Sequence, residues 1–387
     1  MVKKAPGAYW TDEEIKEAIE EWKKKRPERL KTGKWRVEDV PFYEAGRLPR
    51  SDLWHRVDFL DELELIYDKN WGASGLGRLR EVALVRPSEG DLNIFEKQDS
   101  IFMNRPEQAD LKEWQKEHDG YAQILRDNGV KVHLIEYPKP EIGYSIIGPY
   151  GPMRGMWAAA EICVVWGGAL VSRYGCWNPL GKGRERPLTT WLAGQGCPIL
   201  YTIIGKGIGE CGVLQPLADD AVVIPRGMAF NEEGINQLRP ILERVGITTI
   251  VEMHLTSWAP SVKKWEGCGA YHNDGFMNVL APGKILVCEK MCHWETMRWF
   301  RDNDFELVEI DADELMDFIP SNLVVLEPGK VMMHAGASET IRRVKRAGVE
   351  VIEVPYRQNI CMGGGIYCST AQLVRDRGPK LKDFLKV

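Results

Sequence analysis

Short apolar runs alternate with amphipathic stretches along most of this 387-residue chain. Five of the runs have the length and the β-branched character of strands. They cover residues 81–86, 169–173, 221–226, 284–288 and 322–326. After each run, apolar residues recur every three or four positions, as Ile235, Leu238 and Leu242 do, and this period predicts a helix. The helices are predicted over residues 108–127, 186–195, 231–245, 293–302 and 337–347.

A second apolar run follows each predicted helix. Most of these runs begin after a glycine, which suits the left-handed conformation that ends a helix. The second strands are predicted to start at Gly129, Gly196, Gly246, Asp304 and Gly348. These starts lie roughly 45 to 67 residues apart, a spacing within reach of propeller repeats. A doubly wound α/β sheet would show the same alternation, so the pattern alone leaves both folds open.

Residues 1–78 stand outside the repeated units, which occupy residues 79–387. Thr11 and Glu14 have the spacing of a capping box, and Ile15 and Ile19 follow on one face of the predicted N-terminal helix. The segment 35–55 is rich in turn-forming and aromatic residues. We expect this extension to wrap the core or to meet a second subunit, which leaves homo-oligomerisation open.

The charge of the chain argues against a protein that binds nucleic acid or a membrane surface. A net charge of −5, with acids and bases well mixed, provides no field that would attract nucleic acid or an anionic membrane. The chain opens with charged residues and contains no apolar run of about 18 residues, so we expect a cytoplasmic protein.

Nine scattered cysteines predict reduced thiols, and Cys288, Cys292 and His293 are interpreted as packing residues. No metal and no cofactor are expected.

Cys368 is the first candidate for chemistry. It lies in Gly363-Gly364-Gly365-Ile366-Tyr367-Cys368-Ser369-Thr370. Consecutive glycines allow a tight turn and let a substrate or another chain segment approach closely. A thiol with an ordinary pKa near 8.5 needs a base or a lowered pKa to act as a nucleophile at neutral pH.

His272 is the best candidate for that base. It precedes an apolar run, and its spacing from Asp274 puts both side chains on one side of an extended segment. An imidazole and a carboxylate that face one cavity can exchange protons and bind a cation. Glu210, flanked by Gly209 and the Cys211-Gly212 pair, is a second carboxylate in a loop context that suits function.

The order of Glu210, then His272 with Asp274, then Cys368 near the C-terminus resembles the guanidino-group-modifying, or pentein, superfamily of amidinotransferases, deiminases and dimethylarginine hydrolases. Residues 35–41, 165–168 and 375–379 resemble its nitroimidazole nitrohydrolase branch. The resemblance covers residues from about 78 to the end and implies a five-bladed α/β propeller. It also implies that Cys368 is the nucleophile, His272 the general acid/base, Glu210 its assisting carboxylate and Asp274 a substrate-binding carboxylate.

The same resemblance indicates an unusual substrate. Family members that bind guanidinium place an acid after the arginine that corresponds to Arg154, where this chain has Gly155, and Val213 replaces a second acid. A buried guanidinium with fewer anionic partners is disfavoured. Arg154 and Trp157 are expected to bind substrate, although core packing is the favoured reading of the tryptophans at 157, 166 and 177.

Three functions follow from these expectations. The favoured one is a cysteine-dependent hydrolase of a non-peptide carbon–nitrogen bond at an amidine-like or guanidine-like carbon, acting on a small molecule. An amidinotransferase would use the same adduct and pass the amidino group to an amine. A non-catalytic binding module is the third, and it predicts that Cys368 reacts no faster than the other thiols.

Overall fold

The structure, a computed structural model, divides the chain into two compact units, residues 1–70 and 71–387. The residues that it describes are 11–34, 36–39, 43, 45–46, 55–67, 69–89, 91, 109–135, 162–175, 185–255, 272–361 and 363–385. No helix in these ranges is long and apolar enough to cross a membrane.

The first unit contains helices α1 (Asp12–Thr32) and α3 (Phe59–Tyr67) and the 3₁₀ turn η1 (Val37–Asp39). The predicted capping box is confirmed: the Glu14 N–H donates to Thr11 Oγ1 at 3.2 Å, and the Thr11 N–H donates to Glu14 Oε2 at 2.7 Å. Ile15 and Ile19 are buried, as the helical pattern requires. A role of this unit in wrapping the core or in assembly remains a prediction.

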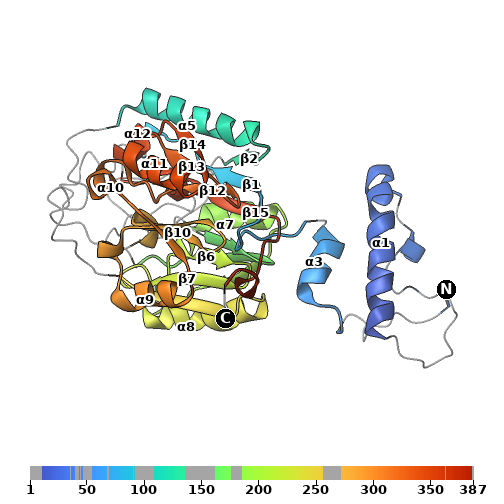
Figure 1. The fold of residues 1–387 in the computed structure, drawn as a ribbon. Helices are drawn as coiled ribbons and strands as arrows, with labels where there is room; N and C mark the ends of the chain where they lie inside the picture. The colour runs from blue at the N-terminus through green and yellow to red at the C-terminus, as the bar shows by residue number, and fades with distance from the viewer. Residues whose placement is uncertain are drawn as a thin grey trace. The chain divides into compact units, whose positions relative to one another are not determined.

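The second unit contains five separate three-stranded sheets (Figure 1). In each, the central strand pairs antiparallel with one neighbour and parallel with the other. In spatial order the strands are β15 (Ala371–Arg375), β1 (Leu79–Leu84) and β2 (Lys131–Leu134); β3 (Ile162–Val165), β4 (Gly168–Val171) and β5 (Ile199–Thr202); β6 (Gln215–Ala218), β7 (Ala221–Arg226) and β8 (Thr249–His254); β9 (Met277–Ala281), β10 (Lys284–Val287) and β11 (Glu306–Glu309); β12 (Val324–Glu327), β13 (Lys330–His334) and β14 (Glu350–Val354). The described strands therefore do not form one doubly wound sheet.

The sequence pattern missed one strand in every sheet. Four of the missed strands, β3, β6, β9 and β15, lie at a sheet edge, and in the fifth sheet the predicted run is the edge strand β12 while the central β13 was missed. Pro216 in β6 illustrates the reason, because a proline reads as a strand breaker yet is tolerated on an edge. The first sheet takes its edge strand β15 from the C-terminus, so it is built from both ends of the second unit.

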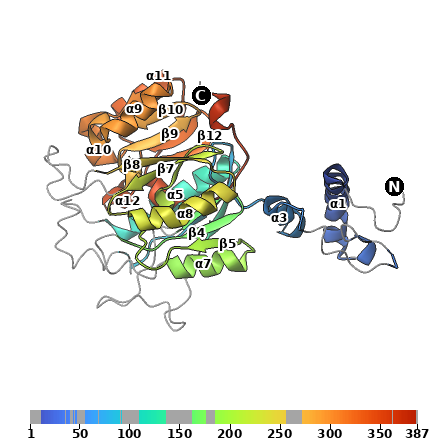
Figure 2. The same cartoon turned by 90° about the horizontal axis from the view of Figure 1, so that it is seen from below.

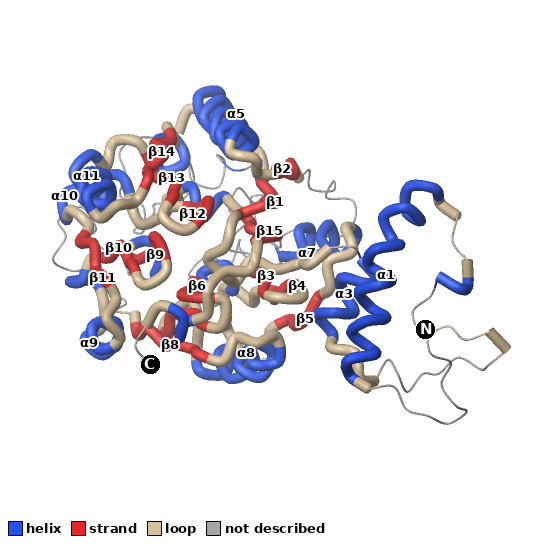
Figure 3. Tube along the Cα trace, turned by 45° about the vertical axis from the view of Figure 1, so that its right-hand side comes forward, coloured by secondary structure: helices blue, strands red, loops and turns tan. Residues whose placement is uncertain are grey.

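The five predicted helices are confirmed and lie at the periphery, with the strands inside (Figures 2 and 3). They are α5 (Leu111–Asp127), α7 (Glu185–Gly194), α8 (Glu232–Arg244), α9 (Trp294–Asp302) and α11 (Ser338–Arg346). The glycines predicted to end four of them have φ between 78° and 88°. Asp304 replaces glycine after α9 with φ 57°, a conformation that aspartate tolerates better than most residues.

Neighbouring sheets meet mainly along their edge strands, and at one place an edge strand meets the central strand β1. β15 packs beside β3, β6 beside β9, β9 beside β12, and β12 beside β1. The short turn η4 (Cys211–Val213) packs against β3 and links the second and third sheets. Through these contacts the described segments that precede β6, β9, β12 and β15 are brought together at one place.

His118 on α5 makes the stability of the protein depend on pH. Its side chain is 1% exposed, and among the described residues neither ring nitrogen has a hydrogen-bond partner; the Asp119 carboxylate lies 3.6 Å from Nδ1. Burial lowers the pKa of His118 from 6.5 to about 4, against the weaker opposite effect of Asp119. The unfolded chain therefore binds more protons between these values, and the free energy of unfolding falls as the pH falls.

We expect the wild type to lose about 2 kcal/mol of unfolding free energy from this group between pH 7.5 and pH 5. His118→Leu should remove that part of the loss, because leucine does not titrate. Urea unfolding of both proteins at the two pH values measures the difference. An equal loss in the two proteins would show that His118 titrates normally in the fold.

Candidate active site

Five polar residues meet where the edge strands begin. Glu210 precedes β6, His272 and Asp274 precede β9, Asn322 precedes β12, and Cys368 precedes β15. They come from four of the five sheets, and consecutive members lie within 4 Å of each other. The packing of the edge strands thus assembles a polar site from segments up to 158 residues apart, the separation of 210 and 368.

Glu210 and His272 form the first pair. Glu210 Oε2 lies 2.7 Å from His272 Nε2, and the carboxylate side chain is 1% exposed while the imidazole is 18% exposed. Backbone contacts hold the glutamate, since its N–H donates to the Ala229 carbonyl and the next N–H, of Cys211, donates to Ser172 Oγ. A buried carboxylate on Nε2 fixes the orientation of the ring, so that Nδ1 faces Asp274.

Asp274, Asn322 and Cys368 form the second group. Asn322 Nδ2 lies 2.7 Å from Asp274 Oδ2 and 3.0 Å from Cys368 Sγ, and the thiol lies 3.5 Å from Asp274 Oδ2. His272 Nδ1 is 3.9 Å from Asp274 Oδ1 and joins the two groups. The result is a continuous path of contacts from Glu210 to the thiol.

A second asparagine fixes the segment that carries the thiol. Asn359 Nδ2 lies 3.0 to 3.1 Å from the carbonyl oxygens of Gly364–Gly365 and from Ser369 Oγ, and Asn359 Oδ1 accepts the indole N–H of Trp114 at 3.0 Å. Asn359 and Trp114 are fully buried. Helix α5 of the first sheet therefore holds the turn that begins the short helix α13 (Ile366–Ser369), on which Cys368 sits.

The electrostatics of the site keep the thiol protonated in the free protein. Burial and the nearby Asp274 carboxylate both raise the pKa of Cys368. Burial also raises the pKa of Asp274, against the opposing effects of His272, Cys368 and Asn322. A substrate must therefore favour loss of the thiol proton, for which Asp274 is the nearest acceptor.

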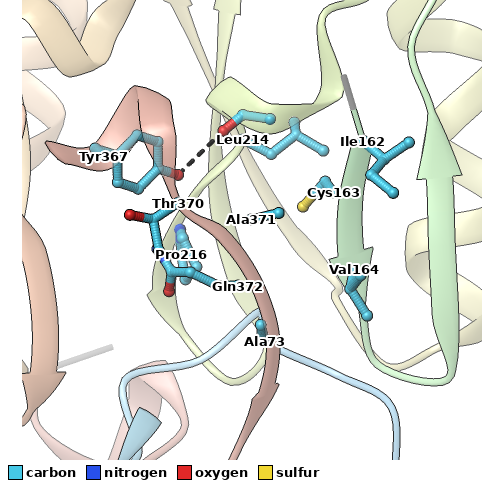
Figure 4. Close-up of a pocket in the computed structure, with 11 residues that line it drawn as sticks. Ala73, Ile162, Cys163, Val164, Leu214, Pro216, Tyr367, Thr370, Ala371 and Gln372 are labelled. Carbon is cyan, nitrogen blue, oxygen red and sulfur yellow. Dashed lines mark hydrogen bonds between the residues drawn. The ribbon is translucent and has the colours of Figure 1, made fainter. Parts of the chain in front are cut away.

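A small cavity lies beside the thiol segment (Figure 4). It is bounded by residues of β3, by the segment from Gly212 to Pro216 and by Tyr367, whose hydroxyl donates to the Gly212 carbonyl at 3.1 Å. Its volume of about 30 Å³ holds one or two waters. A volume of this size does not hold a substrate.

Of the residues predicted from sequence, the structure brings Cys368, His272, Asp274 and Glu210 together. Arg154 and Trp157, predicted to bind substrate, lie outside the described residues, as does Trp177. Trp166 is buried in the core: its indole N–H donates to the Asp219 carbonyl and the Arg377 guanidinium stacks on its ring at 3.7 Å. Within the described residues no group of three or more His, Cys, Asp or Glu could hold a metal ion.

Asn322 is the site residue that sequence reasoning missed. It had been placed at the start of a strand, whereas the strand begins at Val324 and Asn322 lies in the turn before it. A signal was available, because Glu210, His272 and Cys368 also stand two to five residues before an edge strand. A polar residue in the corresponding place of the fifth unit could have been singled out.

Gly365 explains why the thiol follows a glycine run. A Cβ at this position would lie 2.4 Å from Asn322 Oδ1 and 2.8 Å from Asn322 Cβ, closer than real contacts allow. Gly363 has a different reason, since its φ of 89° favours glycine. The predicted close approach is thus made by another chain segment, the turn that carries Asn322.

We expect Gly365→Ala to lower turnover by about a hundredfold, because a shift of the order of 1 Å between Asn322 and the thiol misplaces the reacting atoms. Gly120→Ala is the matched control: this glycine lies within α5, nothing lies within 4 Å of its added Cβ, and alanine favours a helix. Steady-state rates and thermal unfolding of both variants test this. Wild-type turnover in folded Gly365→Ala would contradict the packing argument.

Comparison with known proteins finds relatives of the whole chain. No protein-family model matches the chain. A 2-nitroimidazole nitrohydrolase from Mycobacterium sp. strain JS330 is 32% identical over 376 residues, which cover 93% of this chain and 97% of the nitrohydrolase.

Solved structures share the fold at lower identity. Dimethylarginine dimethylaminohydrolase from Pseudomonas aeruginosa, complexed with citrulline, has a TM-score of 0.59 at 18% identity and covers 76% of this chain and 99% of its own. SxtG, an amidinotransferase from Microseira wollei, has a TM-score of 0.59 at 15% identity and covers 80% and 98%. The N-terminal domain of ArgZ, an arginine dihydrolase of cyanobacteria, has a TM-score of 0.61 at 13% identity and covers 76% and 97%.

The second unit therefore has the mixed α/β fold of these enzymes, with one small sheet for each of five repeats. The identity to the nitrohydrolase extends over nearly the full length of both chains, beyond the part that the solved structures match. The chain therefore belongs to the family of that nitrohydrolase.

Proposed function

We propose that the protein is a hydrolase of a non-peptide carbon–nitrogen bond at an amidine-like carbon, and that it works through a covalent adduct on Cys368. The observation that carries this proposal is the path of contacts from Glu210 through His272, Asp274 and Asn322 to the thiol. A nucleophile and a histidine that is itself oriented by a carboxylate form the arrangement that covalent catalysis needs. The relationship to a nitrohydrolase supports hydrolysis over transfer.

The proposal includes closure of the five sheets into a five-bladed α/β propeller. The contacts between successive edge strands, and between β12 and β1, support it. In such a ring the turns before the edge strands point toward a common axis, which accounts for the meeting of Glu210, His272, Asn322 and Cys368.

The substrate that fits best is a flat, weakly charged heterocycle with an amidine-like carbon, of which a 2-nitroimidazole is an example. Val213, where the superfamily pattern would place a second acid, is buried. A guanidinium would therefore have fewer anionic partners than its burial requires. Asp274, Arg154 and Trp157 remain proposed substrate-binding residues, on sequence grounds.

In the first step the sulfur attacks the electron-poor carbon and the thiol proton passes to the Asp274 carboxylate, 3.5 Å from the sulfur. Collapse of the adduct breaks the bond between this carbon and the leaving nitrogen. A nitro group leaves as nitrite and needs no proton, whereas an amine takes one from His272. The carbon stays bound to sulfur.

In the second step His272, assisted by Glu210, takes a proton from water, and the resulting hydroxide attacks the same carbon. The carbon–sulfur bond then breaks, and the departing sulfur recovers its proton from Asp274. With a nitroimidazole the balance is one water consumed and one ring carbonyl, one nitrite and one proton formed. An amidinotransferase would place an amine where the water acts.

Incubation of the protein with a panel of nitroimidazoles, amidines and guanidines, followed by intact-mass and peptide analysis, tests the proposal. We expect a mass increase on the Cys368 peptide and release of nitrite or ammonia with no amine acceptor present. Turnover that requires an added amine would favour the amidinotransferase. If no panel member reacts and Cys368 is alkylated no faster than the other thiols, the binding module becomes the better reading.

The N-terminal extension, residues 1–78, is proposed to serve in wrapping or in homo-oligomer assembly. Sedimentation of the full chain and of a chain that lacks residues 1–70 tests this. An unchanged mass per particle, after allowance for the removed residues, would exclude the role in assembly.

A further inference from the structure

Asn322 lies between the Asp274 carboxylate and the Cys368 thiol. Its side chain is 3% exposed and comes from the turn before β12, whereas Asp274 and Cys368 come from the turns before β9 and β15. The amide nitrogen lies 2.7 Å from Asp274 Oδ2 and 3.0 Å from Cys368 Sγ. The two N–H groups of an asparagine amide are therefore both used, one on each neighbour.

The orientation of this amide is fixed by its oxygen. The backbone N–H of Cys368 donates to Asn322 Oδ1 at 3.2 Å. A flipped amide would place its oxygen against the Asp274 carboxylate and its nitrogen against that N–H, losing both of these hydrogen bonds. The N–H of Asn322 must therefore point at the sulfur.

The surroundings hold the amide at this distance. Gly365 allows Asn322 to lie against the backbone of the thiol segment. Behind the turn, Asn278 Nδ2 lies 2.9 Å from the Ser321 carbonyl and 3.2 Å from the Leu323 carbonyl, on either side of Asn322. Neither end of the turn can move without losing a buried hydrogen bond, so the donor is preorganised.

We propose that Asn322 is a further catalytic residue, which donates a hydrogen bond to Cys368 Sγ and stabilises the thiolate as it forms and as it departs. The inference rests on the proposed role of Cys368 as nucleophile. A hydrogen bond to the charged form of a group favours that form. Until Asp274 takes the thiol proton, its carboxylate disfavours a negative charge on the sulfur 3.5 Å away, and the hydrogen bond from Asn322 counteracts this effect.

Other titratable groups also act on the sulfur. Asp274 is the nearest, and its charge is in turn offset by His272. The hydroxyls of Tyr356 and Tyr367 lie on the segments before and beside the thiol and are held neutral by burial. Asn322 differs from all of these because it donates to the sulfur at every pH.

The rate at which iodoacetamide alkylates Cys368, followed by peptide mass spectrometry between pH 6 and pH 10, tests the inference without any substrate. Below the pKa of a thiol this rate is proportional to the thiolate fraction. We expect Asn322→Ala to lower it about tenfold, because a hydrogen bond to a charged group is lost. Asn322→Asp has the same shape, and we expect a larger loss because it replaces the donor by a charge.

Asn303→Ala is the control, since Asn303 makes a similar partly buried hydrogen bond, to the Trp299 carbonyl at the end of α9. We expect it to leave the Cys368 profile unchanged. The buried Cys197 thiol reports unfolding, because it becomes reactive only if a variant loses its fold. A wild-type Cys368 profile in folded Asn322→Ala or Asn322→Asp would overturn the inference. A slowed profile in a protein that turns over no panel compound would leave the inference standing and count against the proposed function.

Discussion

Replacement of Cys368 by alanine is expected to lower turnover by about four orders of magnitude or more and to abolish the covalent adduct. Loss of a nucleophile removes the whole covalent route, and the remaining groups then contribute only binding and charge stabilisation. Alanine also leaves Asp274 and Asn322 in place, so substrate binding should change little. Steady-state kinetics and intact-mass analysis with the most reactive panel compound measure both effects.

Cys292→Ala is the matched control for this variant. Cys292 is partly exposed, its thiol donates to the Cys288 carbonyl, and it lies 76 residues before Cys368 in the chain. We expect wild-type turnover and a wild-type adduct. An adduct that persists in Cys368→Ala would show that another cysteine is the nucleophile and would contradict the assignment of Cys368.

The parts of the fold that depend on local sequence signals were predictable from the sequence. Glycines at 129, 196, 246 and 348 end helices in the left-handed conformation, and each marked the boundary between a helix and the strand after it. Four of the five missed strands, β3, β6, β9 and β15, pair antiparallel at a sheet edge, and their identity depends on a neighbour in space. β15 joins the first sheet from nearly 290 residues beyond β1, at a separation that no local pattern reports.

The same distinction between local signals and contacts in space applies to the residues of the candidate site. Cys368, His272 and Glu210 could be singled out because thiol, imidazole and carboxylate groups in glycine-rich turns carry obvious chemistry. Asn322 carries no charge, and its role depends on a donor aimed at a sulfur 46 residues away. Tertiary packing, through the close approach that Gly365 permits, creates that role.

His272→Gln is expected to lower turnover by about a thousandfold, since glutamine keeps a polar side chain beside Glu210 but cannot exchange a proton. The two steps should respond differently. With a nitroimidazole, nitrite leaves without a proton, so the adduct should still form and then accumulate because water is not activated. With a guanidine, adduct formation itself should slow. Time-resolved intact-mass analysis separates the two cases.

His133→Gln is a closely matched control. His133 Nε2 lies 2.8 Å from Glu81 Oε2 and its side chain is 19% exposed, nearly the same values as for His272, although Glu81 is 17% exposed and Glu210 only 1%. The control pair lies on β1 and β2 of the first sheet. If a histidine–glutamate pair served only stability, both variants would lose stability and keep activity. We expect activity to fall in His272→Gln alone, because only that pair is joined through Asp274 and Asn322 to the thiol. Adduct that is resolved at the wild-type rate in His272→Gln would assign the activation of water to another group.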